Sequence, residues 1–179
     1  MRRITFGALL ILITVTLVYG IQAETEWLRF TSPEGRFSVL LPHEPKFEPI
    51  TDPQVKEVTN YRYTDLETGY GFICEYYDVS ATGADLEAFL DTTRDAIIRG
   101  AGATKVAEEK IHLGEYPGRE LELAFIVNNA TNITAQTRIF IVGKRLYSLT
   151  YMHLKDADAK LASETGAKFF SSFKLIPGN

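Results

Sequence analysis

Apolar and polar residues alternate with a period of two along several stretches of the chain, and apolar residues recur with a helical period in two others. The first alternating stretches, 26–31 and 37–41, flank Ser32-Pro33-Glu34-Gly35, where Pro at the second and Gly at the fourth position fit a type I turn. We therefore expect a β-hairpin here. The segment 42–53 follows, and because its four prolines lack an amide donor, we expect a loop that crosses to the next strand.

A second pair of strands and a helix are predicted in the middle of the chain. Residues 55–66 alternate, Glu67-Thr68-Gly69 suits a turn, and residues 70–79 are apolar on both faces, as in a central strand. Thr82 precedes Asp85 by three residues, which resembles a capping box at the start of a helix. Apolar residues at helical spacing follow, and glycines end the helix: Leu86, Phe89, Leu90, Thr93 and Ile97, then Gly100 and Gly102.

Four more strands and a last helix are predicted in the C-terminal half. The strands are 104–113, 119–127, 133–142 and 146–153. Their connections are short, and Gly143-Lys144 fits a two-residue type II′ turn, so these strands should form an antiparallel meander. The helix is expected to run from a cap at Asp156 to about Ser172, with one apolar stripe made of Leu161, Thr165, Phe169 and Phe173.

This order of elements predicts an α+β fold. Two helices beside an antiparallel sheet bury their apolar stripes only by packing on its faces. We therefore expect an antiparallel sheet of about six to eight strands with two helices packed on it. No internal repeat or change of composition marks a second domain, so the sequence predicts a single domain over residues 24–179.

The N-terminus has the pattern of an export signal. Arg2 and Arg3 precede an apolar run over residues 4–18, and Ile21 and Ala23 stand where a signal peptidase reads small residues. We expect residues 1–23 to be a signal peptide and the mature protein to be extracytoplasmic, either periplasmic or secreted. The alternative is an uncleaved membrane anchor, because residues 4–21 form an 18-residue stretch without charge.

Composition narrows the classes of partner. Removal of residues 1–23 leaves 156 residues with 17 basic and 23 acidic side chains, a net charge near −6. Nucleic acid and anionic lipid both require a basic face on the protein, so this balance argues against either partner. The single cysteine, Cys74, excludes an internal disulfide, and its apolar, aromatic strand predicts a buried thiol.

Two short motifs carry a resemblance to known proteins. Trp27 precedes Phe30-Thr31-Ser32-Pro33-Glu34-Gly35-Arg36-Phe37-Ser38-Val39, and Leu113-Gly114-Glu115-Tyr116-Pro117-Gly118-Arg119-Glu120 follows later. With these motifs the chain resembles a group of uncharacterised secreted bacterial proteins. Its order of elements is similar to the fold shared by the photosystem subunit PsbP and the Ran-binding Mog family. The resemblance implies that fold for the mature chain, and no functional residue of either family matches a position here.

The residues that commonly carry chemistry form no spaced motif. His43, His112 and His153 are isolated in sequence. His112 and His153 end strands of the meander and could approach one another, but histidines at strand ends are more often solvated. No Gly-x-Ser-x-Gly motif is present. Carboxylate pairs occur, such as Glu120 with Glu122 and Glu108 with Glu109, and the first pair is explained by the solvated face of an alternating strand. We therefore expect no catalytic residue, metal site or cofactor, while Asn129 and Asn132 head glycosylation sequons that matter only in a eukaryotic host.

The segment Tyr116-Pro117-Gly118-Arg119 is the candidate structural or interaction turn. Pro at the second and Gly at the third position fit a type II turn, with positive φ at Gly118. Arg119 shares strand parity with Leu121 and Leu123, so its guanidinium should point toward the core side. The structural interpretation is that Arg119 pins the hairpin to an acidic residue or a helix end. The functional alternative is that it binds an anionic group of a partner.

Two functions of different classes remain open after the sequence has been read. The first is a non-catalytic binding or assembly factor of the cell envelope, whose partner is another envelope protein. The second is an extracytoplasmic hydrolase whose site is assembled from residues distant in sequence. A deep pocket with converging titratable groups would favour the enzyme, and a shallow surface would favour the binding protein.

Overall fold

The computed structural model describes residues 26–51, 59–65, 69–79 and 85–177. The expected signal peptide lies outside these residues, as do Thr82 and the turn residues Glu67 and Thr68. Ten strands and two helices follow one another in this part of the chain: β1 (Leu28–Ser32), β2 (Phe37–Leu41), β3 (Lys46–Thr51), β4 (Thr59–Asp65), β5 (Tyr70–Asp78), α1 (Leu86–Ala101), β6 (Thr104–Leu113), β7 (Tyr116–Val127), β8 (Thr131–Val142), β9 (Arg145–Leu154), α2 (Ala159–Ser172) and β10 (Lys174–Leu175). None of the described helices has the length and hydropathy needed to span a bilayer.

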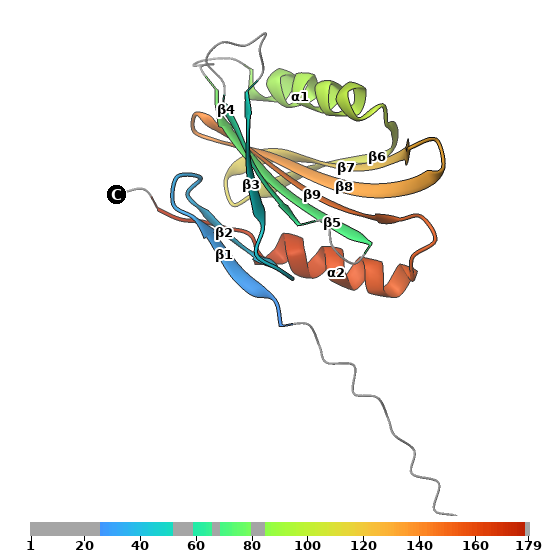
Figure 1. Ribbon diagram of the computed structural model, residues 1–179. Coiled ribbons are helices and arrows are strands. Elements are labelled where there is room, and N and C mark those ends of the chain that lie inside the picture. The colour runs from blue at the N-terminus through green and yellow to red at the C-terminus, as the bar shows by residue number, and fades with distance from the viewer. Residues whose placement is uncertain (1–25, 52–58, 66–68, 80–84, 178–179) are drawn as a thin grey trace, which may run out of the picture.

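The strands form two antiparallel sheets. The larger has seven strands in the order β3-β4-β5-β9-β8-β7-β6, and the smaller has three in the order β1-β2-β10. In Figure 1, α1 covers one face of the large sheet, while α2 and the small sheet lie on the other face. The α+β class is thus confirmed, with two helices packed on an antiparallel sheet of seven strands.

The small sheet departs from the single sheet that the sequence predicts. The hairpin of β1 and β2 does not join the large sheet; it accepts β10 instead, with Lys174 opposite Ser38 and Leu175 opposite Phe37. The partner of β2 therefore comes from the last residues of the described chain. Two residues are too short to give a strand pattern, so no sequence signal indicates β10.

The antiparallel meander from β6 to β9 is confirmed. Its strands pair in chain order, and Val142 faces Arg145 across the two-residue turn Gly143-Lys144. Gly143 has a φ of 61°, which the first position of a type II′ turn requires.

The Pro-rich segment is not wholly a loop. Residues 46–51 form β3, in which Pro49 stands opposite Tyr61 of β4. Because β3 is the edge of the large sheet, one side of it needs no ladder hydrogen bonds, and a proline without an amide donor is tolerated there.

The helices begin at aspartate caps. The cap of α1 is Asp85 itself, and not Thr82 of the predicted capping box: its side chain accepts hydrogen bonds from the amides of Glu87 and Ala88. Gly102 ends the helix, as predicted, with a φ of 58°. The cap of α2 is Asp158 and not Asp156, because the Asp158 carboxylate is the one that accepts from the Leu161 amide, at 2.8 Å.

The buried face of α2 also differs from the expected stripe. Leu161 is 51% exposed, while the buried positions of the helix include Ala162 and Gly166. A Cβ on Gly166 would lie 2.9 Å from the Tyr151 ring, so this small residue lets α2 approach β9 closely. Hydropathy favoured the larger Leu161, whereas close packing selected the small residues.

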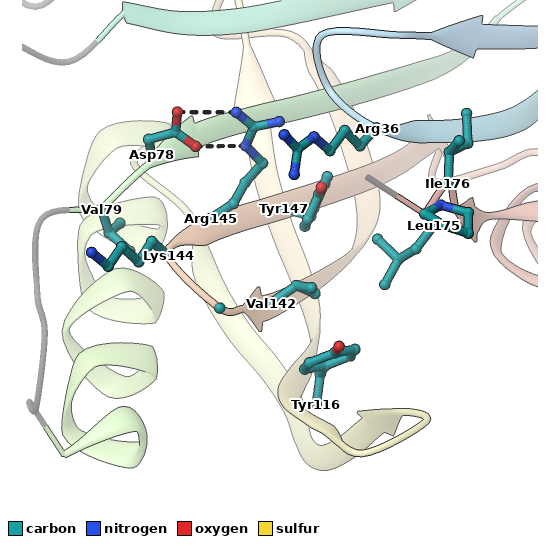
Figure 2. A pocket seen from close by; sticks show the side chains of 12 residues that line it. Arg36, Asp78, Val79, Tyr116, Val142, Lys144, Arg145, Tyr147, Leu175 and Ile176 are labelled. Carbon is teal, nitrogen blue, oxygen red and sulfur yellow. Dashed lines mark hydrogen bonds and ion pairs between the residues drawn. The ribbon is translucent and has the colours of Figure 1, made fainter. Parts of the chain in front are cut away.

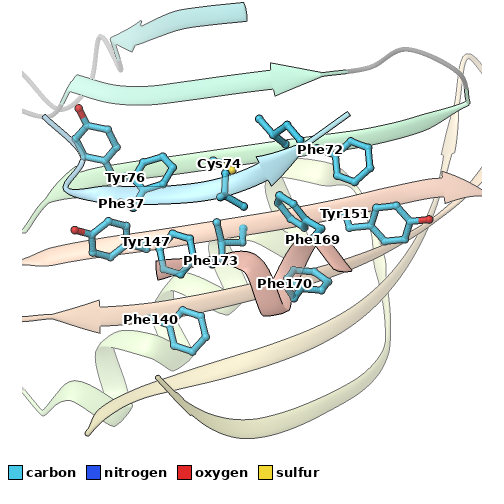
Figure 3. Packing of buried hydrophobic residues seen from close by; sticks show 13 residues of the cluster. Phe37, Phe72, Cys74, Tyr76, Phe140, Tyr147, Tyr151, Phe169, Phe170 and Phe173 are labelled. Atoms are coloured by element: carbon cyan, nitrogen blue, oxygen red, sulfur yellow. The ribbon is translucent and has the colours of Figure 1, made fainter. Parts of the chain in front are cut away.

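Aromatic side chains fill the space between the large sheet, α2 and β2 (Figure 3). The Phe72 ring lies with its centroid 5.2 Å from that of Phe169, and Phe37 lies 5.6 Å from Phe173. Cys74 belongs to this cluster with 1% exposure, and burial raises the pKa of its thiol. The predicted burial of Cys74 is confirmed.

Candidate binding cleft

A cleft of about 750 Å³ lies where the two sheets meet at one end of the molecule. Five segments far apart in sequence form it: the β1–β2 turn, the end of β5, the start of β7, the β8–β9 hairpin, and β10 with the residues that follow it. Figure 2 shows the side chains of Arg36, Asp78, Arg145 and Tyr147 gathered around this space. Chain topology alone brings these groups together.

Arg145 ties three of these segments to one another. Its Nε and Nη2 bind the two carboxylate oxygens of Asp78 at 2.6 and 3.0 Å, and its Nη1 donates to the carbonyl of Glu34 at 2.5 Å. The guanidinium also lies 4.8 Å from the centroid of the Tyr76 ring. The hydrogen bond from Arg145 lowers the pKa of Asp78. Arg145 is thus fully engaged in holding the β1–β2 turn against β5 and β9.

Tyr147 also holds the β1–β2 turn in place. Its hydroxyl donates to the carbonyl of Gly35 at 2.8 Å, and burial raises its pKa. The Gly35 amide donates to Ser32 Oγ at 3.0 Å, and a Cβ on Gly35 would lie 2.6 Å from the Phe37 ring. The turn therefore requires glycine at this position because the aromatic core approaches it closely.

Arg36 follows this turn in an unusual backbone conformation. Its φ is 53°, in the left-handed region that disfavours residues with a Cβ. The backbone is held by two hydrogen bonds, from the Arg36 amide to the Pro33 carbonyl at 3.2 Å and from the Ile176 amide to the Arg36 carbonyl at 2.8 Å. The exposed guanidinium makes no ion pair or hydrogen bond with the residues that the structure describes.

Lys144 adds a third cation beside Arg36 and Arg145. It occupies the second position of the β8–β9 turn, where its carbonyl accepts from the Val79 amide at 2.7 Å. Its ammonium group is exposed and has no ion pair within the described segments. Among the described residues that line the cleft, three thus carry a cationic side chain and one, Asp78, carries a carboxylate, in a protein with a net charge of −4. Such a concentration of one sign attracts an anionic group.

The predicted type II turn at Tyr116-Pro117-Gly118-Arg119 is wrong. The turn is the preceding pair, Gly114-Glu115, with a φ of 63° at Gly114 and Leu113 opposite Tyr116. Pro117 and Gly118 lie in β7, and pairing with β8 begins only at Gly118, so Pro117 disrupts no bond of that ladder. Glycine is needed at position 118 because a Cβ there would lie 2.5 Å from the Phe140 ring.

Arg119 points into the interface between β7 and α1, as its strand parity predicts. Its side chain is 2% exposed, and Nη2 binds Glu87 at 2.7 Å and Asp91 at 3.0 Å. Nε lies 3.5 Å from Glu108, and Nη1 donates to the carbonyl of Gly118 at 3.2 Å. Burial by itself would lower the pKa of Arg119, but the hydrogen bonds to Glu87 and Asp91 raise it.

The four residues of the candidate turn therefore fall on two sides of the sheet. Tyr116 lines the cleft, whereas Arg119 is paired with acidic residues of the helix α1. This geometry favours the structural interpretation of Arg119. The sequence analysis did not single out the cations of the cleft, Arg36, Lys144 and Arg145, although it recognised the turn motifs beside them.

The other candidate residues are dispersed. His112 and His153 do not meet, because β6 and β9 are separated by β7 and β8. Glu108 is 18% exposed and pairs with Arg94 at 2.9 Å. Glu120 binds Arg138 of the neighbouring strand. Within the described ranges, no three His, Cys, Asp or Glu side chains converge as metal ligands would.

Comparison with known proteins identifies the fold. No family model matches the chain, and neither does any curated protein sequence. Among solved structures, cyanobacterial PsbP (CyanoP) from Synechocystis sp. PCC 6803 aligns with a TM-score of 0.56 and 16% identity, covering 87% of this chain and 96% of CyanoP. The Ran-binding protein Mog1p from Saccharomyces cerevisiae aligns with a TM-score of 0.52 and 10% identity, covering 85% and 96%. PA94 from Pseudomonas aeruginosa, a protein of unknown function described as a putative regulator, aligns with 0.50 and 10%, covering 86% and 98%.

At these identities the likeness concerns the arrangement of strands and helices and not the site residues. The order of elements that suggested the resemblance is matched over more than four fifths of the chain. The protein therefore has a PsbP/Mog-like fold.

Proposed function

We propose that this protein is a non-catalytic binding or assembly factor of the cell envelope, and that it holds an acidic group of a partner protein in the cleft. The observation that carries the proposal is the exposed Arg36 guanidinium, which a strained turn directs to the cleft. The export pattern of residues 1–23 supports a location outside the cytoplasm.

The conformation of Arg36 has an energetic cost. A left-handed backbone costs a residue with a Cβ about 1 kcal/mol, and glycine or asparagine would avoid most of that cost. Strained residues persist where the surroundings over-determine them, and they are concentrated at functional sites. Here Arg145, Tyr147 and the Ile176 amide fix the turn, so the guanidinium is presented in a defined place.

The other cations of the cleft also favour an anionic ligand. Arg36 and Arg145 line the same space, and Arg145 is already neutralised by Asp78. Arg36 and Lys144 therefore supply the charge available to a ligand. A carboxylate of a partner would accept hydrogen bonds from the fork of Arg36 in the geometry that guanidinium groups favour. Mog1p, which has this fold, is a Ran-binding protein, so the fold is compatible with binding a protein partner.

A photo-crosslinking amino acid at position 144 tests the proposal in the host cell. We expect a crosslink to one envelope protein from position 144 and none from position 155, an exposed lysine position at the far end of β9. Arg36→Glu should abolish the crosslink because it replaces attraction by repulsion. An undiminished crosslink in the folded Arg36→Glu protein would contradict the proposed site.

Processing of the N-terminus tests the location. We expect N-terminal sequencing of the exported protein to begin at Glu24. A start at Met1 would indicate that residues 1–23 remain as an anchor.

A further inference from the structure

A second hollow, of about 380 Å³, lies on the face of the large sheet that α2 covers. Its lining is mixed. Apolar side chains come from β6, β8, β9 and the end of α2: Ile111, Leu113, Phe140, Leu149, Phe170 and Phe173; Lys110, His112 and Arg138 complete the wall. Gly118 contributes no side chain between Ile111 and Phe140, its register partners on either side. A Cβ on Gly118 would lie 2.5 Å from the Phe140 ring, so glycine lets this ring pack over the strand and form part of the wall.

The hollow continues the cationic cleft. On β8, Val142 lines the cleft and Phe140 lines the hollow, two residues away on the same face. At the end of the chain, Leu175 lines the cleft and Phe173 lines the hollow. Tyr116 of the cleft is the register partner of Leu113 of the hollow. Three separate elements therefore pass from one space into the other.

We infer that the cleft and the hollow form one docking surface for an acidic segment of the partner protein that also carries a large apolar side chain. The inference rests on the proposed function and specifies the partner's chemistry. Arg36 and Lys144 meet the carboxylate, and the apolar side chain enters the hollow beside Phe140. An apolar anchor next to a complementary charge is the usual arrangement of an energetically dominant contact.

The depth of the hollow favours a single side chain as the occupant. Phe140, Phe170 and Phe173 are 4%, 6% and 6% exposed, so the walls leave only a shallow apolar surface. At the far side, Arg138 lies over the Phe170 ring with 4.5 Å from its Cζ to the ring centroid, and it binds Glu120. A charged pair at this position ends the apolar surface. A long hydrocarbon tail would meet these charges, whereas one aromatic or leucine side chain would not.

The strand geometry sets the spacing within the partner segment. Phe140 is two residues from Val142 and four from Lys144, which corresponds to about 7 to 13 Å at the rise of a β-strand. An extended partner segment spans that distance with two to four of its own residues. The acidic residue and the apolar residue of the partner should therefore be separated by two to four positions.

Capped peptides of defined sequence test the inference on the exported protein. The first probe is acetyl-Glu-Asp-Gly-Phe-Gly-Gly-amide; the second replaces Phe by Ala, and the third replaces Glu and Asp by Gln and Asn. Dissociation constants come from amide chemical shifts during titration. We expect the first peptide to bind about tenfold more tightly than either other peptide, with shifts at Gly143 in the cleft and Gly118 beneath the hollow.

Substitutions in the cleft and in the hollow test the two parts of the docking surface separately. Arg36→Gln should weaken the first and second peptides by the same factor. Ile111→Glu, on the partly exposed wall of the hollow, should remove the advantage of Phe over Ala, and the matched control Val106→Glu on the exposed part of β6 should not. The location of the shifts in the unmodified protein provides a measurement that does not depend on the folding of any variant.

The outcomes separate the two proposals. Equal affinity for the Phe and Ala peptides, with loss of both in Arg36→Gln, would overturn the composite surface while leaving the proposed function intact. If no acidic peptide binds and no crosslink forms at position 144, both the composite surface and the proposed function are wrong. Sodium dodecanoate that binds more tightly than the Phe peptide, with shifts through the hollow, would overturn the protein segment in favour of a lipid-like ligand.

Discussion

Arg119→Ala is the substitution that most directly separates a structural role from a partner-binding role. The side chain is 2% exposed and its guanidinium binds Glu87 and Asp91 of α1, so it fastens the helix to β7. Truncation removes the two methylenes beyond Cβ, each worth about 0.8 kcal/mol when buried. It also removes hydrogen bonds to carboxylates whose side chains are 46% exposed, which solvent screening reduces to at most about 1 kcal/mol each.

These contributions predict a loss of about 3 kcal/mol in the free energy of unfolding. For a domain of this size, 1 kcal/mol corresponds to about 2–4 °C, so the melting temperature should fall by about 6–12 °C. Urea denaturation followed by the fluorescence of the single tryptophan, Trp27, measures the loss, because its ring contacts Phe72 with centroids 5.5 Å apart.

Two variants serve as controls for this measurement. Arg94→Ala removes a guanidinium from the same charged network, but its side chain is 19% exposed, and we expect a loss below about 1 kcal/mol. Arg119→Met keeps an apolar stem and should lose less stability than Arg119→Ala. An Arg119→Ala protein with an unchanged urea midpoint and no partner binding would refute the structural interpretation and assign the guanidinium to a ligand.

Three further predictions concern the core and its charges. Gly118→Ala should cost about 1–3 kcal/mol in urea denaturation because the new Cβ would contact the Ile139 carbonyl and the Phe140 ring; an unchanged midpoint would contradict the close approach. Cys74→Ala should cost on the order of 1 kcal/mol, and the native thiol should resist labelling by a thiol reagent because burial raises its pKa; rapid labelling would be inconsistent with this site. Hydrogen bonds from Arg119 and Lys110 lower the pKa of Glu87 to about 2, below its usual 4.5. The stability that the ionised Glu87 carboxylate contributes through these bonds is therefore present above pH 4.5 and is lost as the pH falls toward 2. Glu87→Gln should flatten the pH dependence of the melting temperature in that window, and an unaltered dependence would argue against the pairing.

The local elements of the fold follow from neighbouring residues. The meander from β6 to β9, the cap at Asp85 and the stop at Gly102 depend on side chains within a few residues of one another. Apolar alternation likewise indicated which way Arg119 points. The sequence also carries the export pattern and the overall excess of acidic residues.

Errors arose where a distant contact decided between local alternatives. Pro49 suggested a loop, but an edge position accepts proline in β3. Pro117-Gly118 has the signature of a turn, yet the pairing of β7 with β8 placed both residues in a strand. The buried face of α2 differs from the predicted apolar stripe because the Tyr151 ring packs against the small Gly166, while Leu161 is exposed to solvent.

The candidate site depends entirely on contacts between residues that are distant in sequence. Arg36 and Arg145 are 109 positions apart, and they share a cleft only because Arg145 and Tyr147 bind the carbonyls of Glu34 and Gly35. The amino-acid sequence by itself determined the class of fold and the direction of the Arg119 side chain, because those properties depend on local periodicity. Which cations meet was decided by tertiary structure, because Asp78 and Arg145 become neighbours only when β5 pairs with β9, and packing of the small sheet on the large one then adds Arg36 to the same cleft.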